Sequence, residues 1–91
     1  MTVYIDNTNN NVIVHNKDGL RLIDIISDTP GTLYITKYYR INDTIYPIDV
    51  AQQVPTDSSN INEVITEYIK LSFVPEDNSV TLFKVVVILG E

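Results

Sequence analysis

The sequence predicts a mainly β fold, a small antiparallel sandwich or barrel of about six or seven strands in a single domain, residues 1–91. Composition is the first indication: β-branched and aromatic residues are plentiful, whereas Ala, the best helix former, occurs only as Ala51. The second is the regular recurrence of turn-forming residues, which divides the chain into short apolar or alternating segments. Short turns between consecutive strands favour antiparallel neighbours.

Turn signals separate the expected strands. The Asn-rich residues 6–11 form the first loop, because Asn and Asp side chains bond nearby backbone groups. Residues 18–19 (Asp-Gly) mark the next turn, and residues 30–31 (Pro-Gly) fit a type II turn whose Gly adopts positive φ. Residues 42–43 close a hairpin, and residues 74–79 lead into the last strand. The expected strands cover residues 3–6, 12–16, 20–27, 32–41, 44–50, 64–73 and 80–89, with a long polar connection at 51–60.

The hairpin closed by residues 42–43 has a predicted register. A two-residue loop places Tyr39 opposite Tyr46, and this cross-strand aromatic pair contributes about 0.2–1 kcal/mol. Pro47 has no N–H to donate to a neighbouring strand, so the second strand of the hairpin is expected at a sheet edge or with a bulge.

The strand at residues 20–27 is partly apolar on both faces. Strict alternation places Leu22, Asp24 and Ile26 on one face, and Ile23 and Ile25 on the other.

Residues 60–70 fit either a helix or a strand. A helix has Asn60 as N-cap, Glu63 three residues later and an apolar stripe at helical spacing. A strand from about Val64 suits the many β-branched residues and the absence of Ala. The strand is the favoured interpretation, and a single helix at 60–70 is the alternative. The helical stripe consists of Ile61, Val64, Ile65, Tyr68 and Ile69.

The segment at residues 80–89 contains an unbroken apolar run from Val85 to Leu89. Successive side chains of a strand point to opposite faces, so this run leaves no polar face for water. A helix at 60–70 would cover the second face; without that helix, the cover comes from another subunit. The residues expected at such an interface are Phe83, Val85, Val86, Val87, Ile88 and Leu89.

Charge and composition narrow the function classes. The formal net charge of −6 argues against nucleic acid as a partner, because nucleic-acid binders usually carry a basic surface. No Cys is present for a disulfide, a thiolate metal site or a cysteine nucleophile. The first residues do not resemble a signal peptide, so synthesis in the cytoplasm is expected. The longest apolar run is far below the roughly 18 residues of a membrane span, so no membrane association is expected.

No motif predicts catalysis, a cofactor or a metal site. His15 is the only histidine, and no Ser lies in a G-x-S-x-G turn. The neighbouring carboxylates of Asp24 and Asp28 fit a solvated strand face or structural hydrogen bonds. The Asx-rich loops lack the spacing of an EF-hand, and the few Gly form no phosphate-binding loop. An enzyme is therefore the least expected class, and no catalytic, cofactor-binding or metal-binding residue is assigned.

Aromatic and basic residues alternate within residues 35–41. On a strand, Lys37 and Tyr39 share one face, and Tyr38 and Arg40 share the other. A platform that stacks bases needs these side chains on a common face, so Tyr rings packed beside Lys and Arg stems are the preferred interpretation. These four residues are the ones expected to make surface contacts.

Three functions follow from these observations. The first is a non-enzymatic structural or assembly protein that forms a homo-oligomer or joins other particle proteins, because small folds without disulfides or metals often gain stability by association. A bacteriophage or other virus particle is its expected setting, as a capsid decoration, head-fibre or tail protein located in the virion. The alternative is a small acidic module or inhibitor that docks on a host protein by strand addition. The third is a single-stranded nucleic-acid binder acting through residues 37–40.

Overall fold

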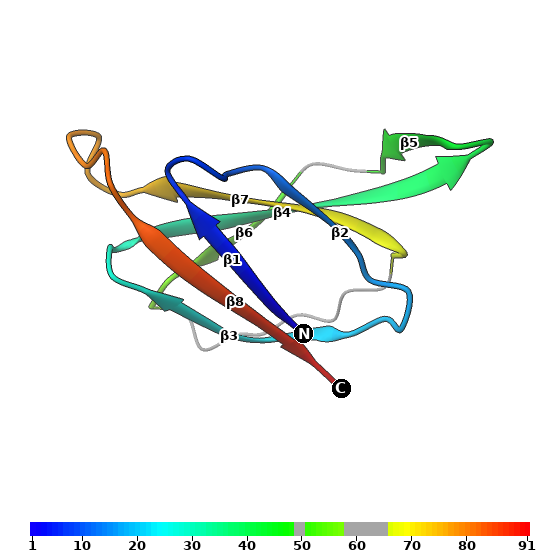
Figure 1. The fold of residues 1–91 in the computed structure, drawn as a ribbon, viewed down its shortest axis with the longest axis horizontal. Helices are drawn as coiled ribbons and strands as arrows, with labels where there is room; N and C mark the ends of the chain where they lie inside the picture. The colour runs from blue at the N-terminus through cyan, green and yellow to red at the C-terminus, as the bar shows by residue number, and fades with distance from the viewer. Residues whose placement is uncertain (49–50, 58–65) are drawn as a thin grey trace.

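Eight β-strands in two antiparallel sheets make up the described part of the computed structural model, residues 1–48, 51–57 and 66–91 (Figure 1). Sheet A has the strand order β1-β8-β3; sheet B has the order β2-β7-β4-β5, with β6 also paired to β4. The predicted mainly β, antiparallel fold is therefore confirmed. The strands are β1 (Thr2–Asp6), β2 (Val12–His15), β3 (Arg21–Ser27), β4 (Gly31–Ile41), β5 (Thr44–Pro47), β6 (Gln52–Pro55), β7 (Tyr68–Pro75) and β8 (Lys84–Gly90).

One hydrophobic core lies between the two sheets. Along β8, the odd-numbered Val85, Val87 and Leu89 point into it, as the two-residue period of a strand requires. The rings of Phe73, in sheet B, and Phe83, just before β8, meet at 5.1 Å between centroids and help to close one end. The remaining buried apolar residues are Val3, Ile5, Val14, Leu22, Leu33, Ile35, Val54, Ile69 and Leu71.

The long strand β4 organises sheet B. One of its edges pairs with β7, and the other pairs first with β6 and then with β5. Tyr39 lies opposite Tyr46, as predicted, and the two rings are stacked with centroids 5.8 Å apart. Asn42 and Asp43 have φ of 49° and 69°, which is the conformation of a type I′ hairpin turn.

Strand β6 corrects the prediction of an uninterrupted polar connection at 51–60. Val54 is buried between the sheets and lies opposite Leu33, so one apolar residue anchors this otherwise polar strand. Residues 49–50 and 58–65 lie outside the described residues, and with them the choice between helix and strand for most of 60–70. The described end of that segment, from Tyr68 onward, belongs to β7.

Gly31 corrects the predicted type II turn. Gly19 is the described glycine with positive φ, at 62°, whereas Gly31 is the first residue of β4 and has no positive φ. Its role is a close approach: a Cβ at this position would meet the carbonyl oxygen of Val74 and lie 2.5 Å from Cζ of the Phe73 ring. The glycine is therefore required by packing against β7 and not by backbone conformation.

A register shift in β3 corrects the predicted alternation of residues 20–27. Leu22 lies opposite Leu89 and Asp24 opposite Ile88, so Ile23 is the extra residue of a bulge. The bulge brings both Leu22 and Ile25 against the core. Asp24 and Ile26 then lie on the outer face of sheet A.

Replacing Gly31 by Ala is expected to lower the free energy of unfolding by about 1–3 kcal/mol, because the new methyl group would collide with the backbone of β7. Urea unfolding followed by circular dichroism measures the change. Gly90→Ala is the matched control: its Cβ would meet the side chain of Ile23 at 3.0 Å, and that side chain is 41% exposed and free to move. Equal losses in the two variants would contradict the close-approach explanation.

Candidate functional site

The residues expected at an interface divide between the inside and the outside of the sandwich. Four of them, Phe83, Val85, Val87 and Leu89, are buried in the core of the chain itself. Val86 and Ile88 point the other way, onto the outer face of sheet A, and are partly exposed. A partner at this strand would therefore contact the two even-numbered residues.

An exposed apolar patch surrounds these two residues. Tyr4 on β1 and Ile26 on β3 both lie opposite Val86, and they are 69% and 53% exposed. Ile23 lies over Gly90 on the same side, since its side chain approaches the outward Cβ position of that glycine. We call this patch the apolar face. It consists of Tyr4, Ile23, Ile26, Val86 and Ile88.

Charged residues border the apolar face at the start of β8. Asp6 lies opposite Lys84. Asp28 clamps the same residue on the other side: its Oδ1 accepts the Lys84 N–H at 3.0 Å, and its own N–H donates to the Lys84 carbonyl at 3.3 Å. The Lys84 N–H, followed by the Thr29 hydroxyl, holds the pKa of the Asp28 carboxyl below its usual value. Bonds from the Thr8 hydroxyl and then the Asn9 and Thr8 backbone lower the pKa of Asp6.

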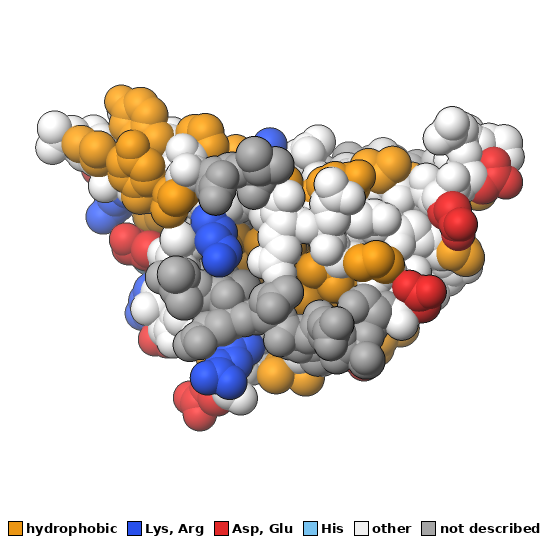
Figure 2. All heavy atoms as spheres, turned by 180° about the vertical axis from the view of Figure 1, so that it is seen from behind, with side chains coloured by type: hydrophobic (Ala, Val, Ile, Leu, Met, Phe, Trp, Pro, Cys, Tyr) orange, Lys and Arg blue, Asp and Glu red, His pale blue; other side chains and the backbone are white. Residues whose placement is uncertain are grey.

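The β4–β5 hairpin is a second apolar surface, separate from the first. It extends past the rest of the sandwich in Figure 1, and hydrophobic side chains gather at that end of the molecule in Figure 2. We call residues 38–48 the hairpin arm. Its exposed apolar side chains lie on one side and are each between 44% and 51% exposed. They are Tyr39, Ile41, Tyr46 and Ile48.

The apolar side of the arm continues the core face of sheet B. Odd-numbered residues of β4, from Leu33 and Ile35 onward, point toward sheet A, and Tyr39 and Ile41 keep that direction. Leu33 and Ile35 are buried, whereas Tyr39 and Ile41 are exposed, because sheet A does not extend over the arm. The arm therefore presents a core-like face that no described residue of sheet A covers.

The four residues expected to make surface contacts are split between two faces, as alternation predicts. Lys37 and Tyr39 lie on the core-facing side of β4, and Tyr38 and Arg40 lie on the outer face of sheet B. The outer face gains further side chains from neighbouring strands: Tyr38 lies opposite Tyr68, which in turn lies opposite His15. Sequence reasoning did not associate these residues, because the register between distant strands brings them together.

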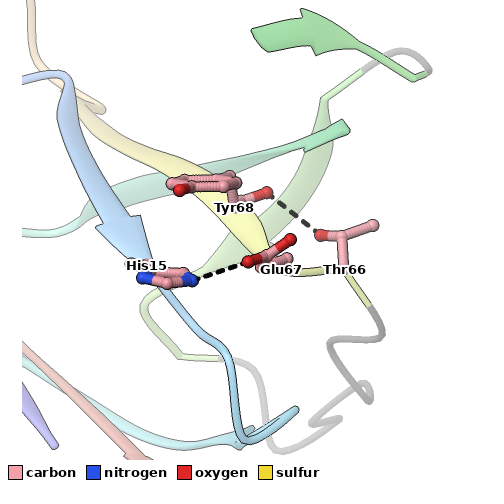
Figure 3. Close-up of polar contacts among 4 residues, drawn as sticks. All are labelled: His15, Thr66, Glu67 and Tyr68. Atoms are coloured by element: carbon pink, nitrogen blue, oxygen red, sulfur yellow. Dashed lines mark hydrogen bonds and ion pairs between the residues drawn. The ribbon is translucent and has the colours of Figure 1, made fainter. Parts of the chain in front are cut away.

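Tyr68 is the centre of this cluster on sheet B (Figure 3). The His15 ring stacks on it at 4.6 Å between centroids and 7° between planes, and the Arg40 Cζ lies 5.7 Å from its centroid. Nε2 of His15 lies 2.9 Å from Oε1 of Glu67, and the Thr66 hydroxyl donates to the Tyr68 carbonyl at 3.1 Å. The His15 and Tyr68 rings and the Arg40 guanidinium are thus held side by side on one surface.

A cleft lies at the other end of the outer face of sheet B. Its volume is about 670 Å³, and Tyr34, Pro55 and Val74 line it together with the carboxylates of Asp57 and Glu76. Within the described ranges, no group of three or more His, Asp or Glu side chains is arranged to hold a metal ion.

Comparisons with protein-family models, curated proteins and solved structures found no match. In the part of the chain that the structure describes, no helix has the length and apolarity needed to cross a membrane.

Asp28→Asn is expected to lower the free energy of unfolding near neutral pH, because it removes the charged acceptor that holds the start of β8. Since folding lowers the pKa of Asp28 below 3.8, its contribution is present above that value and is lost as the pH falls through the folded-state pKa. The difference from the wild type should therefore vanish in strong acid. Urea unfolding near neutral pH and in strong acid measures this difference in the free energy of unfolding. Asp18→Asn is the control, since the Asp18 carboxylate makes no hydrogen bond within the described residues; an equal loss there would contradict the assignment.

Proposed function

We propose that this chain is a non-enzymatic structural or assembly protein that associates with copies of itself through the outer face of sheet A. The observation that carries the proposal is the apolar face around Val86 and Ile88. Exposed apolar residues scattered singly are ordinary on a soluble domain, but a contiguous group on one sheet face favours association.

The free energy that association gains from burying the apolar face can be set against the cost of association. Full burial of one large apolar side chain stabilises by about 1.5–3 kcal/mol relative to leaving it in water. The side chains of the apolar face are only partly exposed, so covering one face contributes about 4–8 kcal/mol, and a contact that covers the faces of two copies contributes about twice as much. The cost of association is about 4–15 kcal/mol, which is in the same range.

The finer form of the proposal places the chain in a virus particle, as a capsid decoration, head-fibre or tail component beside other particle proteins. Its support is the combination of small size, all-β architecture and exposed apolar surface. This support is an analogy with virus particle proteins as a class. Binding of the purified chain to a particle would support this setting, and capture of one stoichiometric host protein by a monomeric chain would instead favour the inhibitor.

A single-stranded nucleic-acid binder is the second candidate function. The observation that favours it is the gathering of Tyr38, Tyr68, His15, Arg40 and Lys70 on the outer face of sheet B. Stacked rings beside cations are the elements of sequence-tolerant binding to single strands. The net charge of −6 opposes it, so binding would depend on this local excess of cations.

Val86→Lys and Val87→Lys separate an interface from a core position. The first variant is expected to stay folded and to dissociate, because Val86 lies on the apolar face. The second is expected to unfold, because Val87 is fully buried and an unpaired charge there costs more than about 4 kcal/mol. Light scattering with circular dichroism measures both properties. Ile13→Lys, at an exposed position on sheet B, is the control and should change neither. A wild type that is monomeric at high concentration and binds no particle would refute the proposal.

Tyr38→Ala and Tyr39→Ala test the second candidate as a matched pair, since the two neighbours lie on opposite sides of β4. If the outer face of sheet B binds single-stranded DNA, the Tyr38 variant loses about 1–3 kcal/mol of binding free energy and the Tyr39 variant loses little. Fluorescence anisotropy at two salt concentrations measures this. Absence of a salt-sensitive signal in the wild type removes the candidate.

A further inference from the structure

We propose that two copies of the chain pair edge to edge through β1, so that sheet A continues from one copy into the next. This contact consists of backbone hydrogen bonds at the edge of sheet A, and it is separate from the contact between outer faces proposed above. Each copy contributes the same strand, so the interface is isologous.

The direction of the backbone groups along β1 follows from one pair of hydrogen bonds. The Met1 amino group donates to the Leu89 carbonyl, and the Leu89 N–H donates to the Met1 carbonyl, both at 2.8 Å. In an antiparallel ladder, such bonded pairs alternate with pairs that exchange no bond, so the odd-numbered residues of β1 bond to β8. The even-numbered residues point their N–H and C=O groups away from β8. They are Thr2, Tyr4 and Asp6.

The open part of this edge consists of Thr2 and Tyr4. Asp6 is already closed, because it exchanges two backbone hydrogen bonds with Asn9, each at 3.2 Å. The outward groups of Thr2 and Tyr4 have no hydrogen-bond partner among the described residues. Each of these two residues has one N–H and one C=O, so four strong hydrogen-bonding groups are left for a partner. An extended strand is the structure that matches such a row of groups.

The edges on the opposite side of the two sheets are closed by the chain itself. In β3, the bulge at Ile23 interrupts the edge, and Oδ1 of Asp24 accepts the outward N–H of Ile25 at 2.8 Å. In β5 and β6, Pro47 and Pro55 occupy outward positions and have no N–H to donate. The open part of β1 has no proline, no bulge and no charged side chain, so none of these features protects it.

Strand β2 has a shorter open edge. Its outward residues are Ile13 and His15, because the Asn16 N–H donates to the Glu67 carbonyl at 2.6 Å in the same ladder. The strand has four residues, and the chain leaves the extended conformation at both of its ends: Asn11 has a φ of 61°, and a turn begins at Asn16. Strand β1 stays in register with β8 over its whole length, so it offers the longer straight edge.

The open part of β1 is complementary to itself, which identifies a second copy as its partner. Two antiparallel copies can be placed with Thr2 of each opposite Tyr4 of the other, and the four outward groups of each copy then all find partners. In this register, the loop that closes Asp6 lies beyond the paired stretch in both copies. The Tyr4 ring, which is 69% exposed in one copy, then has a Thr directly opposite and a second Tyr4 ring on the diagonal, within reach of an aromatic side chain.

Edge pairing also enlarges the apolar face. The combined sheet has the strand order β3-β8-β1-β1-β8-β3, and its outer side carries the apolar faces of both copies next to each other. Tyr4 belongs to the apolar face and lies on the pairing strand, so the two faces meet at the new contact and form one continuous surface.

Amide hydrogen exchange followed by NMR tests the contact at single residues. The Tyr4 N–H should exchange quickly in dilute protein and about 10-fold more slowly once nine-tenths of the chains are paired, because only the unpaired chains exchange. The Ile13 N–H is the matched control, since it is an outward amide on β2 and should show no such change. Val86→Lys removes the contact between outer faces, so this variant should stop at the edge-paired dimer and keep the protection of Tyr4.

Thr2→Pro and Thr2→Val separate the backbone from the side chain at the same position. Proline removes the outward N–H and leaves the bonds to β8 in place, whereas valine keeps this N–H and the β-branched shape. Thr2→Pro should weaken edge pairing at least about 10-fold, because each copy loses one of the bonds that it donates to the other. Thr2→Val should pair as the parent does. Multi-angle light scattering in the Val86→Lys background measures edge pairing alone, and circular dichroism confirms that each variant is folded.

The remaining outcomes distinguish the two contacts. If Ile13 gains protection in place of Tyr4, or if the two Thr2 variants pair equally well, the inference is wrong. If the wild type associates while the Tyr4 amide still exchanges quickly, the inference is wrong and association through the outer faces stands. If the wild type forms nothing larger than the dimer of Val86→Lys, with Tyr4 protected in both, edge pairing stands and the contact between outer faces fails. A wild type that is monomeric at all concentrations refutes both.

Discussion

The position of β8 at the centre of sheet A is the constraint on which the rest of the molecule depends. Hydrogen bonds to β1 and β3 fix both of its edges, so its side chains can only alternate between the two faces of the sheet. Val85 and Val87 meet sheet B and complete the core. Val86 and Ile88 must then lie outside, and because both are apolar, the outer side of β8 is apolar as well. The apolar face is thus a direct consequence of placing an unbroken apolar run in a two-layer fold.

Strand β4 creates the second surface by the same alternation. It runs for 11 residues, and its core-facing side is covered only where sheet A lies against it. Past that point the pattern of apolar residues continues through Tyr39 and Ile41, and no second layer meets them in the part of the chain that the structure describes. Pro47 is the last residue of β5. Strand β6 then pairs with an earlier part of the same edge of β4, so β5 covers this edge only along the arm.

Local signals predicted the fold class, the register of the Tyr39–Tyr46 hairpin and the alternation of residues 37–40, because each depends on neighbours in sequence. Gly31 could not be assigned from sequence, since its requirement comes from a ring on β7. The bulge at Ile23 was equally hidden, because a register shift is set by the paired strand. For the candidate site, the apolar run from Val85 to Leu89 predicted an interface, but only the strand order could show which of its residues are core. The arm escaped notice because alternation does not reveal where the opposite layer ends.

The packing of the two sheets fixes how the two apolar surfaces lie relative to each other. The apolar face belongs to sheet A and the arm belongs to sheet B, so the angle between them is set by how the sheets cross over the shared core (Figure 1). The rings of Phe73 and Phe83 pack against each other in that core. A substitution that changed their packing would shift one sheet on the other, and it would therefore move the apolar face relative to the arm without altering a residue of either surface.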